Sequence, residues 1–223
     1  LGAGVEIGHV HVLSLLGVLG ALAAVVGALL ALSQQNVKRM FAYGGISHIG
    51  LILIGVSQGN PTGFAGGMFY LINDAVMQAG LFFIAGAAIY RHQAHTVEEW
   101  SRLRGASPWM TFALVVLGMS MIGIPPTGGF FGKWYIILGA MEAGNYLAVG
   151  AVVLATLLTM AYFQRLFVSV FRDGQASPPA VRVETELSLR LSVGVTAVTI
   201  IILGLCSDPI ISFFRNTASS VGL

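Results

Sequence analysis

The stretch MIGIPPTGGFFGKWYII, residues Met121 to Ile137, decides the fold, because two adjacent prolines, several glycines and a lysine interrupt an otherwise apolar run. Proline cannot continue a helix, since it has no N–H and its ring clashes with the preceding turn. Glycine adds conformational freedom at the same place. The sequence therefore predicts a helix break formed by Pro125, Pro126, Gly128 and Gly129 inside an apolar segment.

The composition indicates an integral membrane protein. Of 223 residues, 56% are apolar and only 9% are charged, whereas soluble domains have about 25% charged residues. The single cysteine, Cys206, excludes an internal disulfide and a thiolate cluster. The scattered histidines do not form a convincing metal set, and no haem-attachment or nucleotide-binding motif is present. We therefore expect no metal, no cofactor and no nucleic-acid partner.

Six apolar segments are long enough to cross a bilayer, which takes about 20 residues for roughly 30 Å of hydrocarbon. They are read as helices, because a membrane barrel would need alternating polar residues. The expected fold is one all-α membrane domain over residues 1–223, with spans at 10–32, 37–56, 64–90, 109–141 (broken at 125–129), 146–172 and 187–214. The chain starts at Leu1 without signal-peptide features, so we expect a fragment whose N-terminal part is missing.

The distribution of Lys and Arg favours one broken fourth span over two separate spans. If the segment is one span, nine basic residues lie on one side of the membrane and only Arg215 lies on the other. If it is two spans, six basic residues lie on one side and four on the other. Basic loops favour the cytoplasmic side of the inner membrane. The ends of the chain are then expected on the other side. The nine residues are Lys38, Arg39, Arg91, Arg102, Arg104, Arg165, Arg172, Arg182 and Arg190.

Three ionisable residues lie far inside the spans: His48, Asp74 and Lys133. Such groups are functional candidates, because a charge at the bilayer centre is costly. His48 is either a neutral imidazole bonded to a neighbouring carbonyl or a proton relay. Tyr70, Asp74 and Gln78 recur every four residues and share one helix face. Tyr70 and Gln78 could also act only by bonding a partner helix.

The position of Lys133 just after the break predicts a proton-exchanging group. Irregular backbone in a membrane is tolerated only where it is buried in protein or lines a water-filled cavity, so the break indicates a hydrated interior. If the helix restarts near Phe130, Lys133 lies in or close to its first turn. The positive end of the helix dipole and the loss of water would then both disfavour the charged ammonium form.

Three motifs carry a family resemblance: SQQNVKRMFAYGGISHIG, FYLINDAVMQAGLFFIAGAAIY and GMSMIGIPPTGGFFGKWYII, at residues 33–50, 69–90 and 118–137. From about Leu13 to Phe214 the chain resembles the proton-conducting antiporter-like subunits of respiratory complex I and of the Mrp multisubunit cation/proton antiporters. That family has two inverted five-helix repeats, each with one interrupted helix. The resemblance implies that this chain is the second repeat and the helix after it.

The resemblance also implies roles for individual residues. Lys133 matches the lysine of the second broken helix, which is proposed to exchange protons with the exit half-channel. Lys38 and Arg39 match a Lys-Arg pair that is expected to anchor the helix at the membrane boundary. Many relatives carry His, His and Lys where this chain has Tyr70, Asp74 and Gln78. The central relay therefore runs through Asp74, His48 and water, or it is impaired.

The motifs point to two branches of the family. The stretch around the break is close to the N-type subunit of complex I. The Asn73-Asp74 pair of the third span, the loop VEEWSRLRGASPWM and GAMEAG look more like the Mrp D-type subunit, which we favour. Either branch implies other membrane subunits as partners, protons as cargo, and Na⁺ or K⁺ as candidate exchanged cations. Any oxidoreductase activity would belong to the assembly. The alternative is a structural or quinone-contacting subunit without its own proton path.

Overall fold

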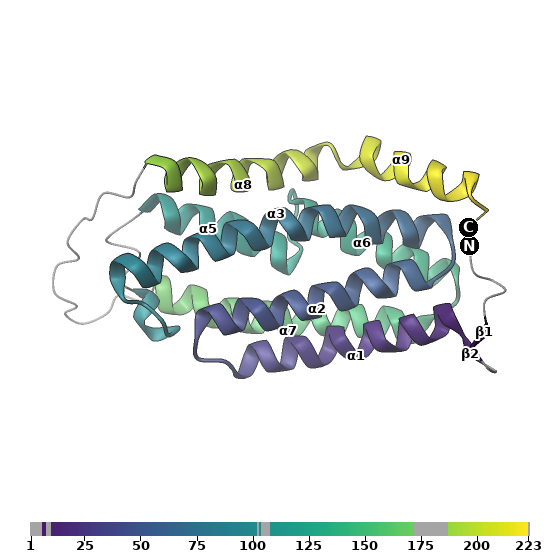
Figure 1. Cartoon of the computed structure of the whole chain (residues 1–223), viewed down its shortest axis with the longest axis horizontal. Helices are drawn as coiled ribbons and strands as arrows, with labels where there is room; N and C mark the ends of the chain where they lie inside the picture. Colours follow the sequence, from purple (N-terminus) through teal and green to yellow (C-terminus); the bar gives the residue numbers. More distant parts are fainter. Residues whose placement is uncertain (1–5, 8–9, 102, 104–107, 172–186, 223) are drawn as a thin grey trace.

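Long helices running roughly parallel form the bundle in Figure 1, a computed structural model that describes residues 6–7, 10–101, 103, 108–171 and 187–222. Two short strands, β1 (Glu6–Ile7) and β2 (Val10–His11), pair antiparallel before the first helix. The helices are α1 (Val12–Ser33), α2 (Val37–Ser57), α3 (Pro61–His92), the 3₁₀ turn η1 (Glu98–Ser101), α5 (Pro108–Ile122), α6 (Gly128–Glu142), α7 (Tyr146–Phe171), α8 (Leu187–Leu205) and α9 (Ser207–Ser220).

Five of the described helices, α1, α2, α3, α7 and α8, are long and apolar enough to cross a membrane, and α5 is a shorter apolar helix. Helices α5 and α6 follow one another along the bundle and together cross it once (Figure 1). The prediction of a discontinuous fourth segment is therefore confirmed. The break lies at residues 123–127 rather than 125–129, because Gly128 and Gly129 already belong to α6.

The segment predicted as one last span, residues 187–214, is divided into α8 and α9 at Cys206. Pro209 gives the physical reason, because its ring would clash with the carbonyl of Leu205 in a continuous helix. Helix α8 ends at Leu205 and α9 begins at Ser207. The junction packs against the break between α5 and α6, where Gly204 lies directly against the carbonyl of Pro126.

Helices α1 and α2 approach closely through small residues. Every buried residue that α1 contributes is glycine or alanine: Gly20, Ala24, Gly27, Ala28 and Ala31. The Ser47 hydroxyl of α2 donates to the carbonyl of Ala24 at 2.6 Å. Close approach through small residues is common between membrane helices.

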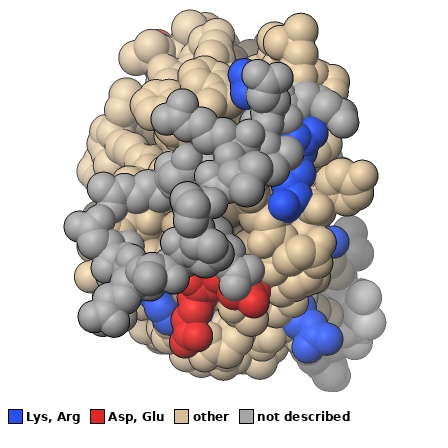
Figure 2. Space-filling view, turned by 90° about the vertical axis from the view of Figure 1, so that its left-hand side faces the viewer, with Lys and Arg blue, Asp and Glu red and all other residues tan. Residues whose placement is uncertain are grey.

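Basic residues gather at one end of the bundle, where α2 and α8 begin and α3 and α7 end. The described ones are Lys38, Arg39, Arg91, Arg165 and Arg190, and Figure 2 shows blue side chains over this end beside a smaller acidic patch. Arg215 lies in α9, toward the opposite end. Arg102, Arg104, Arg172 and Arg182 lie outside the described residues.

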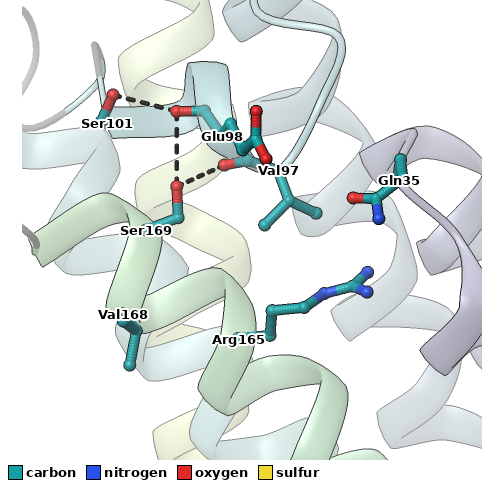
Figure 3. Close-up of a pocket in the computed structure, with 7 residues that line it drawn as sticks. All are labelled: Gln35, Val97, Glu98, Ser101, Arg165, Val168 and Ser169. Carbon is teal, nitrogen blue, oxygen red and sulfur yellow. Dashed lines mark hydrogen bonds between the residues drawn. The ribbon is translucent and has the colours of Figure 1, made fainter.

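Side chains of α7 hold the loops at this end together (Figure 3). The loop after α1 pairs with the loop after α3, since Val97 N–H donates to the Gln35 carbonyl at 2.9 Å. The Arg165 guanidinium donates to the carbonyls of Leu32, at 3.0 Å, and Gln34. The Ser169 hydroxyl donates to the Val97 carbonyl. Arg165 therefore ties the end of α1 and the loop after it to α7.

Gly129→Ala is expected to destabilise the fold by about 1–3 kcal/mol, the usual range for overpacking. A Cβ at Gly129 would lie on the carbonyl oxygen of Ser120, which is fixed backbone. Gly150→Ala is the control, because a Cβ there meets nothing within 4 Å. Thermal unfolding of the detergent-solubilised protein measures the difference. Equal melting temperatures for both variants would contradict the close packing at the break.

Candidate functional site: the broken helix and a buried polar cluster

The carbonyl groups at the C-terminal end of α5 are hydrogen-bonded by the backbone of Gly123 and Ile124 and by the Lys133 side chain. Gly123 adopts φ +90°, a left-handed conformation that favours glycine. The N–H groups of Gly123 and Ile124 both donate to the Met119 carbonyl, at 2.9 and 2.8 Å. The first is the 5→1 hydrogen bond of an αL helix ending, and the second is the 6→1 hydrogen bond found in Schellman endings. The Lys133 amino group donates to the carbonyls of Met121 at 2.8 Å and Ile122 at 3.1 Å. Lys133 therefore replaces the donors that a continuous helix would have supplied.

At the amide end of α6 the Gly129 N–H is bonded by Ser120, whose side chain is held by Asn73. The Gly129 N–H donates to the Ser120 hydroxyl at 3.2 Å, and the Ser120 side chain is hydrogen-bonded to the Asn73 amide at 3.2 Å. Both side chains are fully buried. Ile124, Pro125 and Pro126 are exposed, and the two prolines carry no N–H that would need a partner. Protein groups therefore satisfy the carbonyls that end α5 and the Gly129 N–H, and the hydrated interior stays a prediction.

The surroundings of Lys133 differ from the expectation. Because α6 starts at Gly128 rather than near Phe130, Lys133 lies in its second turn. Its amino group faces the carbonyl end of α5, which is the negative end of that helix dipole, and not the amide end of α6. Only 5% of Lys133 is exposed. A pocket of about 170 Å³, lined in part by Trp134 and Val153, reaches Lys133 from the side of α7.

His48 and Asp74 form a buried pair between α2 and α3. The His48 Nδ1 lies 2.9 Å from the Asp74 Oδ1, with His48 fully buried and Asp74 8% exposed. The second ring nitrogen of His48, Nε2, is buried without a hydrogen-bond partner among the described residues. The expected alternative, a histidine bonded to a backbone carbonyl, is thus not what the structure shows. A His–Asp pair can hold or pass a proton.

Tyr70 lies between this pair and Lys133. The Lys133 amino group lies 5.9 Å from the centre of the Tyr70 ring, within the range of a cation–π contact. The Tyr70 and His48 ring centres are 5.6 Å apart. The structure therefore brings the three predicted ionisable residues around one aromatic ring, although no direct hydrogen bond joins Lys133 to the pair among the described residues.

Gln78 lies one turn beyond Asp74 on α3, as the spacing predicts. Both polar atoms of its amide are buried without a partner among the described residues, and the amide packs against Gly45 of α2.

Lys38 and Arg39 are exposed in the first turn of α2. Lys38 is ten residues before His48, about 15 Å along the helix. Their role as boundary anchors stays a prediction.

Sequence reasoning missed three buried polar residues at the site: Asn73, Ser120 and Tyr162. A signal was available for Asn73, since it is adjacent to Asp74 in a run of apolar residues. Ser120 and Tyr162 are ordinary residues for membrane helices, and only the packing shows their neighbours. Within the described residues no group of His, Cys, Asp and Glu side chains could hold a metal ion.

Comparison with known proteins agrees with this architecture. Residues 6–159 match the family model described as NADH:quinone oxidoreductase/Mrp antiporter, TM. NADH-quinone oxidoreductase subunit N of Desulforudis audaxviator is 32% identical over 212 residues, which cover 90% of this chain and 42% of that protein. The chain thus spans less than half the length of this curated relative.

Two solved structures share the fold. A chain of respiratory complex I from Thermus thermophilus superposes with a TM-score of 0.80 and 27% identity, over 95% of this chain and 45% of that chain. A chain of the Mrp complex from Dietzia sp. gives a TM-score of 0.81 at 22% identity, over 93% of this chain and 47% of that chain. The broken helix, the buried lysine and these matches lead to one conclusion: the chain belongs to the NADH:quinone oxidoreductase/Mrp antiporter family of membrane subunits.

Proposed function

We propose that this chain moves protons across the membrane as a subunit of a multisubunit complex. The observation that carries the proposal is the buried Lys133 amino group, which lies over Tyr70 beside the His48–Asp74 pair. A buried lysine and a His–Asp pair are groups that can change protonation, and scaffolding does not call for three such side chains at one depth. Gln78 extends the cluster along α3. Lys133, Asp74, His48, Gln78 and Tyr70 would together form the path, with water completing it.

A purely structural subunit, with or without a quinone contact, is the second candidate, and one observation favours it. The Lys133 amino group satisfies two carbonyls at the end of α5, so the lysine also has a structural task. An ammonium has three donors and a neutral amine has two, so both forms can make these two hydrogen bonds. The geometry is therefore compatible with a lysine that gives up and regains a proton without releasing α5.

The direct test is proton movement by the assembled complex carrying Lys133→Met. Under the proposal the complex assembles and proton movement is lost. If the variant complex assembles and moves protons at the normal rate, the proposal is wrong. If it fails to assemble, the structural candidate gains support, and the arginine variant described in the Discussion distinguishes the two.

The complex we propose is of the NADH:quinone oxidoreductase type, with the Mrp antiporter type as the alternative. The names of the curated relatives, NADH-quinone oxidoreductase subunit N, support the first. The loop motifs that favour an Mrp D-type subunit support the second. Inverted membrane vesicles separate them: NADH oxidation should drive proton uptake in the first case, and an imposed Na⁺ or K⁺ gradient should do so in the second.

The proposed location is the inner membrane, with the basic end of the bundle in the cytoplasm. Lys38, Arg39, Arg91, Arg165 and Arg190 lie at this end, and basic residues favour the cytoplasmic side. Other membrane subunits are the expected partners.

A further inference from the structure

Tyr162 of α7 presents a buried hydroxyl group for which the proposed path has no role. The residue is 0% exposed, and its hydroxyl oxygen makes no hydrogen bond to any described residue. Thr159, one turn earlier, donates its own hydroxyl hydrogen to the Ala155 carbonyl at 2.8 Å, so toward the Tyr162 hydroxyl it can act only as an acceptor. Buried tyrosine hydroxyls normally have a partner. A position that needed only a large apolar ring would be satisfied by phenylalanine, as at the neighbouring Phe163.

The hydroxyl group points at the backbone of α2 beside the polar cluster. A Cβ added to Gly44 would lie 2.8 Å from the Tyr162 oxygen, so this glycine makes room for the hydroxyl. Gly44 is four residues before His48 and therefore lies on the same face of α2. The next residue, Gly45, packs in the same way against the Gln78 amide, with its added Cβ 3.0 Å from the amide nitrogen. Gly44 and Gly45 therefore leave space for two polar groups without hydrogen-bond partners, the Tyr162 hydroxyl of α7 and the Gln78 amide of α3.

Tyr162 also adjoins the broken helix. The end of the Met121 side chain reaches the same point on Gly44 as the Tyr162 hydroxyl. The carbonyl of Met121 accepts a hydrogen bond from Lys133. Tyr162 therefore lies against the face of α2 that carries His48, next to Met121, whose carbonyl binds Lys133. The Gln78 amide of α3 lies against the next residue of α2, Gly45. Four side chains in this region, His48, Tyr70, Gln78 and Tyr162, carry buried polar atoms without partners among the described residues.

We propose that Tyr162 is a further member of the proton path and links the Gln78 and His48 side of the cluster to the Lys133 side. This inference rests on the proposed function. The hydroxyl oxygen accepts a proton from a hydrogen-bonded neighbour or water while its own hydrogen passes to the next acceptor. The phenol is unchanged after the step, so no oxidant or net charge is needed. A hydroxyl group is suited to this step because it both donates and accepts.

The test is Tyr162→Phe in the full-length subunit within its assembled complex, with proton uptake measured in inverted vesicles. The change removes one oxygen and keeps the ring in the core. We expect proton uptake to fall on the order of 10²-fold, the lower end of the range for a lost proton-transfer group. The amount of assembled complex and its melting temperature should stay the same. The solvent deuterium isotope effect on the remaining rate should increase, which a packing role would not produce.

Tyr146→Phe is the matched control, since Tyr146 begins the same helix and is 72% exposed. It should move protons at the normal rate. Normal uptake in Tyr162→Phe, together with loss of uptake in Lys133→Met, would overturn the role of Tyr162 and leave the proposed function intact. Equal losses in Tyr162→Phe and Tyr146→Phe, or a loss that follows reduced assembly, would also overturn it. Normal uptake in Lys133→Met would overturn the proposed function itself.

Discussion

Lys133→Arg is expected to abolish proton movement while the complex stays assembled. Arginine keeps the positive charge and supplies donors for the carbonyls of Met121 and Ile122, which lie 2.8 and 3.1 Å from the lysine nitrogen. Arginine does not release its proton in proteins, so it can cap α5 but cannot pass a proton on. The variant thus separates the two tasks that the structure gives to Lys133. Proton uptake by inverted vesicles, normalised to the assembled complex, measures the result.

Two companion variants complete the Lys133 experiment. Lys133→Met removes both the donors and the exchangeable proton, and Lys38→Arg changes an exposed lysine in the first turn of α2. The proposal expects no uptake with Lys133→Arg or Lys133→Met, and normal uptake with Lys38→Arg. A purely structural lysine predicts a different pattern, in which Lys133→Arg works normally and Lys133→Met loses assembly. Normal uptake by Lys133→Arg would therefore contradict proton exchange at this residue.

Asp74→Asn is expected to reduce proton uptake on the order of 10²-fold, the lower part of the range for a lost acid–base group. Asparagine is similar in size to aspartate and keeps an oxygen that can accept from the His48 Nδ1, now 2.9 Å from Asp74. It carries no charge and cannot take up a proton at neutral pH. The packing between α2 and α3 should survive, so the rate falls without loss of the complex. The same vesicle assay, with the assembled amount as reference, checks this.

The control for Asp74 is Asp208→Asn, which removes an exposed carboxylate in the first turn of α9. It should leave the rate unchanged. His48→Gln combined with Asp74→Asn should be no slower than the slower single variant, because residues that act as one unit are not additive. A wild-type rate in Asp74→Asn would show that the pair is structural and that the relay does not pass through it.

The sequence predicted the fold through local patterns. Hydropathy and segment length indicated the helices, because the cost of unpaired backbone in lipid leaves few alternatives. Pro125 and Pro126 indicated the break, since proline disrupts a helix wherever it stands inside one. The same rule applied to Pro209 would have predicted the division between α8 and α9, which was not foreseen. The four-residue spacing placed Tyr70, Asp74 and Gln78 on one face of α3.

Only the tertiary structure decided which groups meet. The sequence placed Lys133 near the amide end of α6, but its long side chain reaches back to the carbonyls that end α5. The rotation of α2 against α3 joins His48 to Asp74, which are 26 residues apart. Tyr162 comes to Gly44 from α7, whose sequence pattern does not single this residue out. Periodicity fixes the face of a helix on which a residue lies, whereas its partners depend on how the helices turn and pack against one another.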